Sequence, residues 1–215
     1  FNALDGTQQW QFRTDNEVAF PTLDNRTVYV GSYDECIYAL DAADGTEQWQ
    51  FQTGDGVDSA PTIADETVYA GNNEGYIYAL DATEGTEKWS FETDAAVLYS
   101  PTVVDQTIYV GSRDHHVYAI DATDGTEQWS FEPEDSIDTV GTGPLAVLNE
   151  TVYIGGDDTV YALAADEGAE QWSFEVADSV GSSPAVTTDG VYLGGNDGTV
   201  YALATSDGTE QWRFE

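Results

Sequence analysis

The stretch YALDATEGTEKW, residues 78–89, decides the fold because close copies of it recur along the whole chain. Each copy ends on a tryptophan, and successive tryptophans lie 39, 40, 40, 43 and 40 residues apart. The six are Trp10, Trp49, Trp89, Trp129, Trp172 and Trp212. A period near forty residues is the sequence signature of a repeat architecture, in which each unit buries its faces against its neighbours.

Proline supplies a second marker in each repeat. Five of the 6 prolines recur once in each repeat, at Pro21, Pro61, Pro101, Pro144 and Pro184. From each of these five to the next tryptophan is always 28 residues, whereas the distance from a tryptophan to the next of these prolines varies from 11 to 15 residues. The repeat therefore has a constant part and a variable part.

Residues 50–89 show the strand pattern of the repeat. Segments rich in Val, Ile, Tyr and Thr at 62–64, 67–71, 76–80 and 87–91 are separated by turn residues. These segments predict four short strands, A to D. In the fourth strand Trp89 and Phe91 alternate with Lys88 and Ser90, which predicts an outer strand with one packed side and one wet side.

Four strands in each forty-residue unit predict an all-β chain, a β-propeller of four-stranded antiparallel blades. A β-solenoid is the alternative, but its repeats are usually shorter and lack a four-strand pattern. We expect a single propeller domain over residues 1–215, with five complete repeats and one extra N-terminal outer strand at residues 1–10. The blade repeats fall at about 11–49, 50–89, 90–129, 130–172 and 173–212. Either five blades close with a spare strand, or the chain is part of a longer propeller.

The turn between strands C and D carries glycine in every repeat, at Gly45, Gly85, Gly125, Gly168 and Gly208. We expect left-handed backbone there, which other residues resist. Asp41, Asp81 and Asp121 open this turn in the first three repeats, but Ala164 and Ala204 open it in the last two. These aspartates are therefore interpreted as turn braces and not as a functional set.

The charge of the chain is one-sided, with 41 Asp and Glu against 5 Lys and Arg and a formal net charge of -36. An acidic disordered chain would be poor in aromatic residues, yet this chain has 6 Trp, 13 Tyr and 8 Phe. The composition therefore predicts a folded, halophilic protein that is covered with carboxylates. It also excludes nucleic acid as a partner, because phosphate binding needs patches of Lys and Arg.

Cys36 is the only cysteine, so an intrachain disulfide is excluded. We interpret it as a small buried hydrophobe at the start of a strand. No stretch is apolar for long enough to predict a membrane span, and no signal peptide is visible. Because the chain begins at Phe1 without methionine, we expect a processed protein or a piece of a longer one.

The text YALDA-x-x-G-x-x-x-W, preceded by SP-x-V and VYVGS, resembles the repeat of the PQQ (pyrroloquinoline quinone) enzyme family, the tryptophan docking motif. Residues 38–49, 78–89 and 118–129 match it best. The resemblance implies a propeller and a structural role for all six tryptophans, each stacked between blades. With its acidic composition, the chain resembles a haloarchaeal-type member of that family.

The function implied by the resemblance divides in two. Some members are alcohol or sugar dehydrogenases that hold PQQ and Ca²⁺, and several of them carry adjacent cysteines. Other members are non-catalytic scaffolds, such as outer-membrane assembly lipoproteins and sensor domains attached to kinases. The lone Cys36 and the scarcity of Arg and Lys favour a non-enzymatic scaffold without PQQ or catalytic residues.

Three functional hypotheses follow. The first is an interaction scaffold that binds a protein or surface ligand outside the cytoplasm, a location implied by the resemblance alone. The alternatives are a PQQ- and Ca²⁺-dependent dehydrogenase, or a fragment of one, and an extracellular sensor domain of a larger receptor. The sequence defines neither the ligand nor the oligomeric state.

A binding face is expected where the repeats differ. Strand direction places the D–A and B–C loops together on one face of a propeller, and the loop before Pro144 is three residues longer than most. Loops on a rigid scaffold are where binding residues concentrate. The candidate face consists of Tyr33, Asp58, Tyr99, Arg113, His115, Asp138, Thr142, Asp157 and Ser182.

Two kinds of metal site are considered on this face. Asp58, Asp135 and Asp138 offer hard oxygen ligands that suit Ca²⁺, although the acidic surface of a halophile is the favoured explanation for them. His115 and His116 could hold a metal with the preceding aspartate. Adjacent residues of a strand point to opposite faces, so a turn residue followed by a strand residue is the favoured interpretation.

Overall fold

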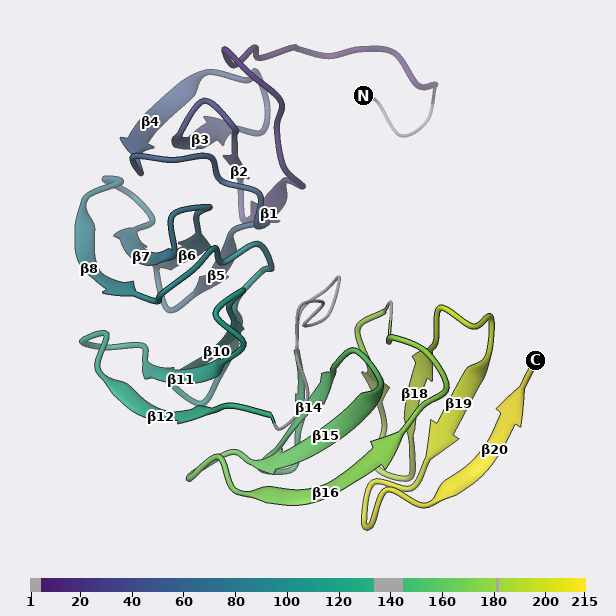
Figure 1. Ribbon diagram of the computed structural model, residues 1–215. Coiled ribbons are helices and arrows are strands. Elements are labelled where there is room, and N and C mark those ends of the chain that lie inside the picture. The colour runs from purple at the N-terminus through teal and green to yellow at the C-terminus, as the bar shows by residue number, and fades with distance from the viewer. Residues whose placement is uncertain (1–4, 134–144, 181) are drawn as a thin grey trace. The chain divides into compact units, whose positions relative to one another are not determined.

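The structure is a computed structural model that describes residues 5–133, 145–180 and 182–215. Within these residues the chain forms twenty strands and no helix, and hence no helix able to cross a membrane. The strands assemble into five separate four-stranded antiparallel sheets, each built from consecutive strands. These sheets are the blades of a β-propeller, as the repeat predicts (Figure 1).

The strands of each blade run from A to D in chain order. Blade 1 has β1 (Thr22–Asp24), β2 (Thr27–Gly31), β3 (Cys36–Asp41) and β4 (Glu47–Gln52). Blade 2 has β5 (Thr62–Ala64), β6 (Thr67–Gly71), β7 (Tyr76–Asp81) and β8 (Glu87–Glu92). Blade 3 has β9 (Thr102–Val104), β10 (Thr107–Gly111), β11 (Val117–Asp121) and β12 (Glu127–Phe131). Blade 4 has β13 (Ala146–Leu148), β14 (Thr151–Gly155), β15 (Thr159–Ala164) and β16 (Glu170–Glu175). Blade 5 has β17 (Ala185–Val186), β18 (Val191–Gly194), β19 (Val200–Leu203) and β20 (Glu210–Phe214).

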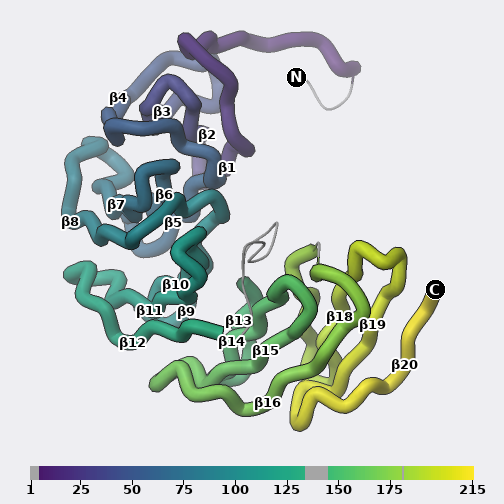
Figure 2. Tube along the Cα trace, viewed as in Figure 1, coloured from purple at the N-terminus to yellow at the C-terminus, as the bar shows by residue number. Residues whose placement is uncertain are grey.

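The chain forms two compact units, Phe1–Leu98 with blades 1 and 2, and Tyr99–Glu215 with blades 3 to 5. Within each unit the first strands of adjacent blades contact one another, β1 with β5, β9 with β13 and β13 with β17. The D strands lie on the opposite edge of each sheet (Figure 2). This convergence of A strands is the radial packing that allows a blade to bury both of its faces.

A β-bulge shapes the outer strand of every blade. In blade 2, Trp89 lies opposite Ala79 and Glu87 lies opposite Leu80, so Lys88 is an extra residue in the ladder. The same shift occurs in the other four blades. A bulge bends the strand and increases its twist. In blade 2, Trp89 is buried while Lys88 before it is exposed.

Tryptophan joins neighbouring blades. In unit 1 the indole N–H of Trp49 donates a 3.0 Å hydrogen bond to the carbonyl oxygen of Ala82, and the hydroxyl of Tyr29 donates to the same oxygen at 3.2 Å. The ring of Phe51 meets Tyr78 edge-on with centroids 5.3 Å apart. These contacts close an apolar layer between blades 1 and 2, and buried aromatic rings of this size contribute strongly to stability.

The same joint recurs in unit 2. The indole of Trp129 donates to the carbonyl of Ala165 at 2.9 Å, and the indole of Trp172 donates to the carbonyl of Thr205 at 2.9 Å. Both tryptophans are buried among apolar residues of two blades. Trp49, Trp129 and Trp172 each contact the next blade of the same unit through the indole N–H.

The N-terminal segment packs like an outer strand without being paired as one. Trp10 donates its indole N–H to the carbonyl of Ala42 at 2.9 Å, and Phe12 meets Tyr38 edge-on at 5.3 Å. Among the described residues, however, 7–14 form no ladder with any sheet. The segment expected to be an extra outer strand therefore packs its aromatic side chains against blade 1, but its described residues are not paired with any sheet.

Two smaller predictions concern single residues. Cys36 begins β3 and is buried, and burial raises the pKa of its thiol, as expected for a small buried hydrophobe. Gly85 has a φ of 67°, the left-handed backbone expected in the C–D turn. In the same turn the Oδ1 atom of Asp81 accepts the N–H groups of Thr83 and Glu84 at 2.9 and 3.0 Å, as expected of a turn brace.

Candidate functional site

The D–A and B–C loops of unit 1 form one surface, here called the loop face, made of residues 32–35, 53–61 and 72–75. Backbone hydrogen bonds tie the D–A loop to both B–C loops. The N–H of Val57 donates to the carbonyl of Ser32 at 3.0 Å, and the N–H of Asn73 donates to the carbonyl of Gly56 at 2.9 Å. The two kinds of loop therefore share a face, as strand direction predicts.

The loop face is anchored to the core. Val57 is fully buried, and a Cβ added to Gly31 would lie 2.4 Å from its Cγ1 atom, so glycine is required for this close approach. The hydroxyl of Ser59 accepts the N–H of Gly71 and donates to its carbonyl, both at 2.9 Å. These contacts tie the loop to the core of unit 1.

Tyr33 and Asp58 are brought together on this face. A side-chain hydrogen bond with Asp58, together with burial and the nearby carboxylate charge, raises the pKa of Tyr33 to about 12. A Cβ added to Gly56 would lie 3.3 Å from Cδ1 of Tyr33 and 3.1 Å from Nδ2 of Asn73. Tyr33 is nevertheless 37% exposed. We call Tyr33, Gly56, Asp58 and Asn73 the Tyr33 cluster.

Hydrogen-bond acceptors lie close to the Tyr33 cluster. Oδ2 of Asp34 accepts the hydroxyl of Tyr38 and the N–H of Asp15, both at 2.9 Å. Within the described residues, Oδ1 of Asp34 and Oδ1 of Asn73 are buried and have no hydrogen-bond partner. An unpaired buried polar atom costs free energy, so these two acceptors are a local cost of the loop arrangement.

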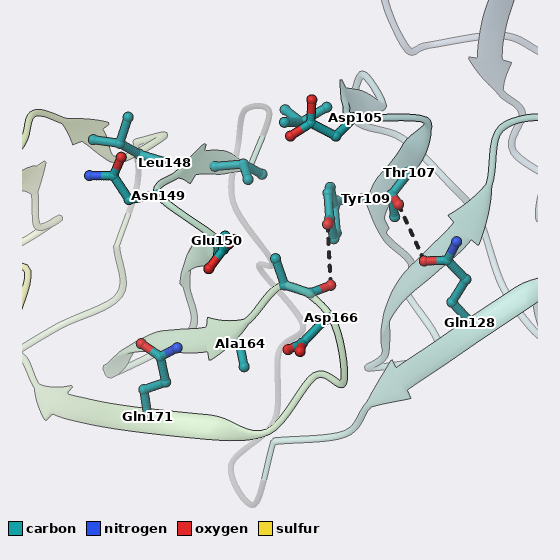
Figure 3. Close-up of a pocket in the computed structure, with 13 residues that line it drawn as sticks. Asp105, Thr107, Tyr109, Gln128, Leu148, Asn149, Glu150, Ala164, Asp166 and Gln171 are labelled. Carbon is teal, nitrogen blue, oxygen red and sulfur yellow. Dashed lines mark hydrogen bonds between the residues drawn. The ribbon is translucent and has the colours of Figure 1, made fainter.

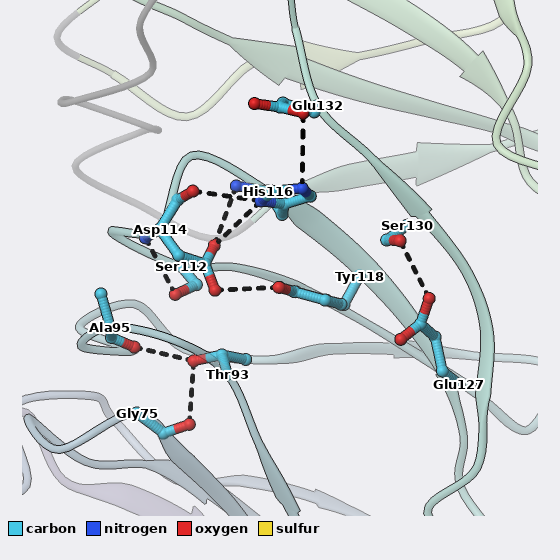
Figure 4. A network of polar contacts seen from close by, with 10 residues as sticks. All are labelled: Gly75, Thr93, Ala95, Ser112, Asp114, His116, Tyr118, Glu127, Ser130 and Glu132. Carbon is cyan, nitrogen blue, oxygen red and sulfur yellow. Dashed lines mark hydrogen bonds and ion pairs between the residues drawn. The ribbon is translucent and has the colours of Figure 1, made fainter.

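The histidines of unit 2 are not part of a metal-binding cluster among the residues that the structure describes. His115 has a φ of 73° in the B–C loop, and His116 lies just before β11. His116 lies between two carboxylates, with Nδ1 at 3.5 Å from Oδ1 of Asp114 and Nε2 at 3.8 Å from Oε2 of Glu132 (Figure 4). No group of three or more His, Cys, Asp or Glu residues in the described parts of the chain could hold a metal ion.

The carboxylate of Asp114 accepts hydrogen bonds that hold the B–C loop of blade 3 in place. Its Oδ1 atom accepts the backbone N–H of His116 at 3.0 Å, and its Oδ2 atom accepts the hydroxyl of Tyr118 at 2.8 Å. Asp34 and Tyr38 repeat the bond from tyrosine to aspartate in blade 1, and Asp197 and Tyr201 repeat it in blade 5. The aspartate therefore braces the B–C loop in several blades.

The other predicted site residues differ in how exposed they are and in what they contact. Arg113 is exposed, whereas Tyr99, Asp157 and Ser182 are partly buried. Ser182 accepts the N–H of Gly194 at 2.9 Å, so it serves the blade as Ser59 does. The remaining predicted residues, Asp135, Asp138 and Thr142, lie outside the described residues.

A groove that sequence reasoning missed lies between blades 3 and 4, at the ends of the strands opposite to the B–C loops (Figure 3). It has a volume of about 1050 Å³. Its apolar part includes Tyr109, and its carboxylates are Asp105, Glu150 and Asp166. Burial, followed by the charges of Asp105 and Asp166, raises the pKa of Tyr109.

The residues beside this groove differ from their counterparts in blade 2. There Lys88 reaches the hydroxyl of Thr67 at 2.8 Å and the carboxylate of Asp81 at 3.6 Å. In blade 4 Gln171 stands in place of the lysine, and its Oε1 atom accepts the hydroxyl of Thr151 at 3.3 Å, while Ala164 stands in place of the aspartate. Both Gln171 and Ala164 line the groove.

The comparisons with known proteins agree with this architecture. The profile of the family described as outer membrane protein assembly factor BamB matches residues 1–75, 53–155 and 113–215. No curated protein matches the chain.

Several solved structures are similar. BamB from Moraxella catarrhalis has a TM-score of 0.81 at 21% identity, covering 96% of this chain and 64% of that one. The computationally designed protein Ika8 has a TM-score of 0.81 at 19% identity, covering 92% and 61%. The quinohemoprotein alcohol dehydrogenase ADHIIG from Pseudomonas putida HK5 has a TM-score of 0.78 at 19% identity, covering 96% and 43%.

At these identities the solved structures show a shared fold and nothing about activity. This chain spans less than two thirds of the length of each of the three. The family profile, in contrast, matches the chain from end to end. The chain therefore belongs to the family described as outer membrane protein assembly factor BamB.

Proposed function

We propose that this chain is a non-enzymatic scaffold that binds a protein partner through its loop face, with the Tyr33 cluster at the centre of contact. The observation that carries the proposal is an exposed tyrosine, Tyr33, on loops that hydrogen bonds and a buried valine hold in place. Tyrosine is enriched at protein interfaces because a rigid ring supplies contact area at low entropic cost, while its hydroxyl remains available for hydrogen bonds.

The use of the other aromatic residues supports a scaffold. Trp49, Trp129 and Trp172 are engaged in joints between blades, and so are Tyr29 and Tyr109. They are therefore not available to stack on a sugar or a quinone. Tyr33 differs from them because it is the exposed aromatic side chain of the loop face.

Charge defines the kind of partner. The loop face carries Asp34, Asp55 and Asp58 and no lysine or arginine between residues 27 and 87. This one-sided charge favours a partner surface that supplies Lys, Arg or amide donors. Charge complementarity of this kind gives specificity and speeds encounter, and salt weakens it.

The family description supports two further parts of the proposal. It names an outer membrane protein assembly factor, so we infer for this chain a role in holding other proteins and a location outside the cytoplasm.

Photo-crosslinking tests the loop face. Benzoylphenylalanine replaces Tyr33 in one variant, which keeps an aromatic ring at this position. In the control variant it replaces Arg26, an exposed residue of the A–B turn at the other end of β2. Both variants are irradiated in extract of the source cells at high salt, and the adducts are identified by mass spectrometry.

The proposal expects a discrete protein adduct from position 33 that excess unmodified chain competes away. Excess Tyr33→Ala chain is expected to compete poorly. Equal labelling from position 26, or equal competition by the Tyr33→Ala chain, would show that the loop face is not the binding surface.

A further inference from the structure

Two A–B turns of the chain carry the tripeptide Asn-x-Thr. One is Asn-Arg-Thr at residues 25–27, between β1 and β2, and the other is Asn-Glu-Thr at residues 149–151, between β13 and β14. Of the seven asparagines in the sequence, Asn25 and Asn149 alone have Ser or Thr two positions later. Asn-x-Ser/Thr, in which x is not proline, is the acceptor motif for N-linked glycosylation.

The asparagine is exposed in both turns. Asn25 and Asn149 lie at the surface. The amide nitrogen of Asn25 donates a 2.9 Å hydrogen bond to Oδ2 of its neighbour Asp24, and this bond is itself exposed. Asn149 lines the groove between blades 3 and 4 (Figure 3). Neither side chain is enclosed by its blade, so a glycan attached to either one is compatible with the fold.

The conformation of the turn does not by itself require asparagine. Asn25 and Asn149 have φ values of 50° and 51°, in the left-handed region that favours Asn and Asp. Asp65 and Asp105 hold the same place in blades 2 and 3 with φ values of 45° and 48°. Aspartate therefore meets the backbone requirement equally well. What Asn25 and Asn149 add is an amide nitrogen, the atom that accepts a glycan.

The threonine of the motif has a role in the blade and is not evidence for modification. The hydroxyl of Thr27 donates to Oε1 of Gln48 at 3.2 Å, and that of Thr151 donates to Oε1 of Gln171 at 3.3 Å. Threonine also begins the B strand of blades 2 and 3, where no asparagine precedes it. The inference therefore depends on the asparagines, and blades 2 and 3 provide turns of the same kind that are not acceptors.

We propose that Asn25 and Asn149 are N-glycosylation sites, and that the donor is an oligosaccharide carried on a lipid phosphate. In the transfer, the amide nitrogen forms a bond to the anomeric carbon of the first sugar. The bond between that carbon and the phosphate oxygen breaks, the lipid phosphate leaves with the electron pair, and the amide loses one proton. The inference rests on one part of the proposed function, the location outside the cytoplasm, where such a transfer takes place.

Glycans at these turns leave the loop face open. Asn25 precedes β2 and Tyr33 follows it, so the two residues lie at opposite ends of this strand (Figure 1). In unit 2, Asn149 likewise lies at the end of β14 opposite to its B–C loop. Glycosylation of the A–B turns is therefore compatible with a protein partner at the Tyr33 cluster.

Mass spectrometry tests the two sites. The protein purified from its source cells is compared with the same chain made in a host that lacks N-glycosylation. Cleavage after glutamate is suitable because the chain has only 5 Lys and Arg. It places Asn25 in the peptide 18–35 and Asn149 in a peptide that begins at residue 135. Both peptides from the source cells are expected to carry a shared glycan mass, and the same peptides from the other host are expected to carry none.

Two variants made in the source cells separate the acceptor atom from the turn. Asn25→Asp places at this turn the residue that blades 2 and 3 already use there, so the fold should persist while the glycan on peptide 18–35 is lost. Asp65→Asn completes an acceptor motif with Thr67 and is expected to add a glycan to the peptide 48–66. In the matched control, Asp65→Asn combined with Thr67→Val, this gain should be absent.

Three results would overturn the proposal. Peptides that are unmodified in protein recovered outside the cytoplasm would remove both glycosylation sites and leave the proposed location standing. Unmodified peptides in protein that cell fractionation places in the cytoplasm would remove the sites together with that part of the proposed function. A glycan that remains on peptide 18–35 in Asn25→Asp would assign the modification to another side chain.

Discussion

The indole of Trp49 lies so close to Gly85 of the next blade that a Cβ added to the glycine would be 2.5 Å from Cδ2 of the ring. The same glycine has a φ of 67°. One residue therefore meets two requirements, because it adopts left-handed backbone and leaves room for the neighbouring tryptophan. This explains why the C–D turn varies at the positions before the glycine but retains the glycine in all five repeats.

The replacement Gly85→Ala separates these two requirements. Left-handed backbone costs a residue with a Cβ roughly 1–2 kcal/mol, and overpacking against the indole adds about 1–3 kcal/mol. Gly198→Ala is the matched control, because Gly198 has a φ of 86° and no atom within 4 Å of an added Cβ. Denaturant unfolding at high salt should show the larger loss for Gly85→Ala, and equal losses would mean that the close contact contributes nothing.

A reciprocal exchange tests the turn aspartates. The Oδ1 atom of Asp121 accepts the N–H of Thr123 at 2.7 Å, and this bond is the main cause of its lowered pKa. Ala164 stands at the same place in blade 4 and lines the groove. We expect Asp121→Ala to lower the melting temperature and Ala164→Asp to raise it, with a smaller groove in a crystal structure of the second variant.

The effect of the aspartate depends on pH with a definite sign. Because the folded pKa of Asp121 lies below its ordinary value, its contribution is fully present above the unfolded pKa and is lost as pH falls through the folded pKa. The difference in melting temperature between the parent and Asp121→Ala should thus be complete at pH 7 and disappear in acid below the usual carboxyl range. These melts need multi-molar KCl, so that changing self-repulsion does not mask the effect. A difference that persists in strong acid would contradict the role of the carboxylate.

The Tyr33 cluster makes a prediction about titration. Asp58 is the largest cause of the raised pKa of Tyr33, which is about 12. The replacement Asp58→Asn removes the charge and the strong acceptor, so the pKa of Tyr33 should fall toward the ordinary value of 10.0. Carbon NMR of labelled tyrosine, assigned with Tyr33→Phe, measures this pKa. An unchanged pKa in Asp58→Asn would show that the two side chains do not interact in solution.

Salt should control stability. The chain has 41 acidic residues, and the described part contains three ion pairs made by lysine or arginine, at Arg26, Lys88 and Arg213. Self-repulsion is strong at 0.1 M salt, where the Debye length is about 10 Å, and is screened at 1 M, where it is about 3 Å. We expect the melting temperature and the near-ultraviolet circular dichroism to rise steeply with KCl. A signal that is the same in dilute buffer would contradict a halophilic adaptation.

The fold was predictable because each repeat of about forty residues in the sequence forms one four-stranded blade. In blade 2 the expected segments 62–64 and 67–71 are strands with those bounds, and the other two strands extend one residue further than expected. The β-bulge at Lys88 was not predicted, since the alternation of Trp89 with exposed neighbours is the same with or without it. The sequence also did not reveal that residues 7–14 lack backbone pairing. Their residue pattern is that of an outer strand, but a pattern cannot tell whether a neighbouring strand is there to pair with.

The candidate site was predictable only in part. Strand direction placed the D–A and B–C loops on one face, and Tyr33 and Asp58 do meet there. The sequence could not indicate that Ser182 is used by the backbone of its own blade. It also could not reveal the groove beside Ala164, because the groove depends on side chains from two blades that are distant in sequence.

We propose that the loop face of this chain binds a protein, while its buried aromatic rings join neighbouring blades. Because those rings are engaged in the joints, we expect the chain to hold no quinone. The most direct test is a fluorescence and calorimetric titration of the folded chain with PQQ, with and without Ca²⁺, in multi-molar KCl. The tryptophans would report a bound quinone by quenching. The account predicts no saturable change under either condition, and a saturable, Ca²⁺-dependent quenching with a matching heat of binding would contradict it.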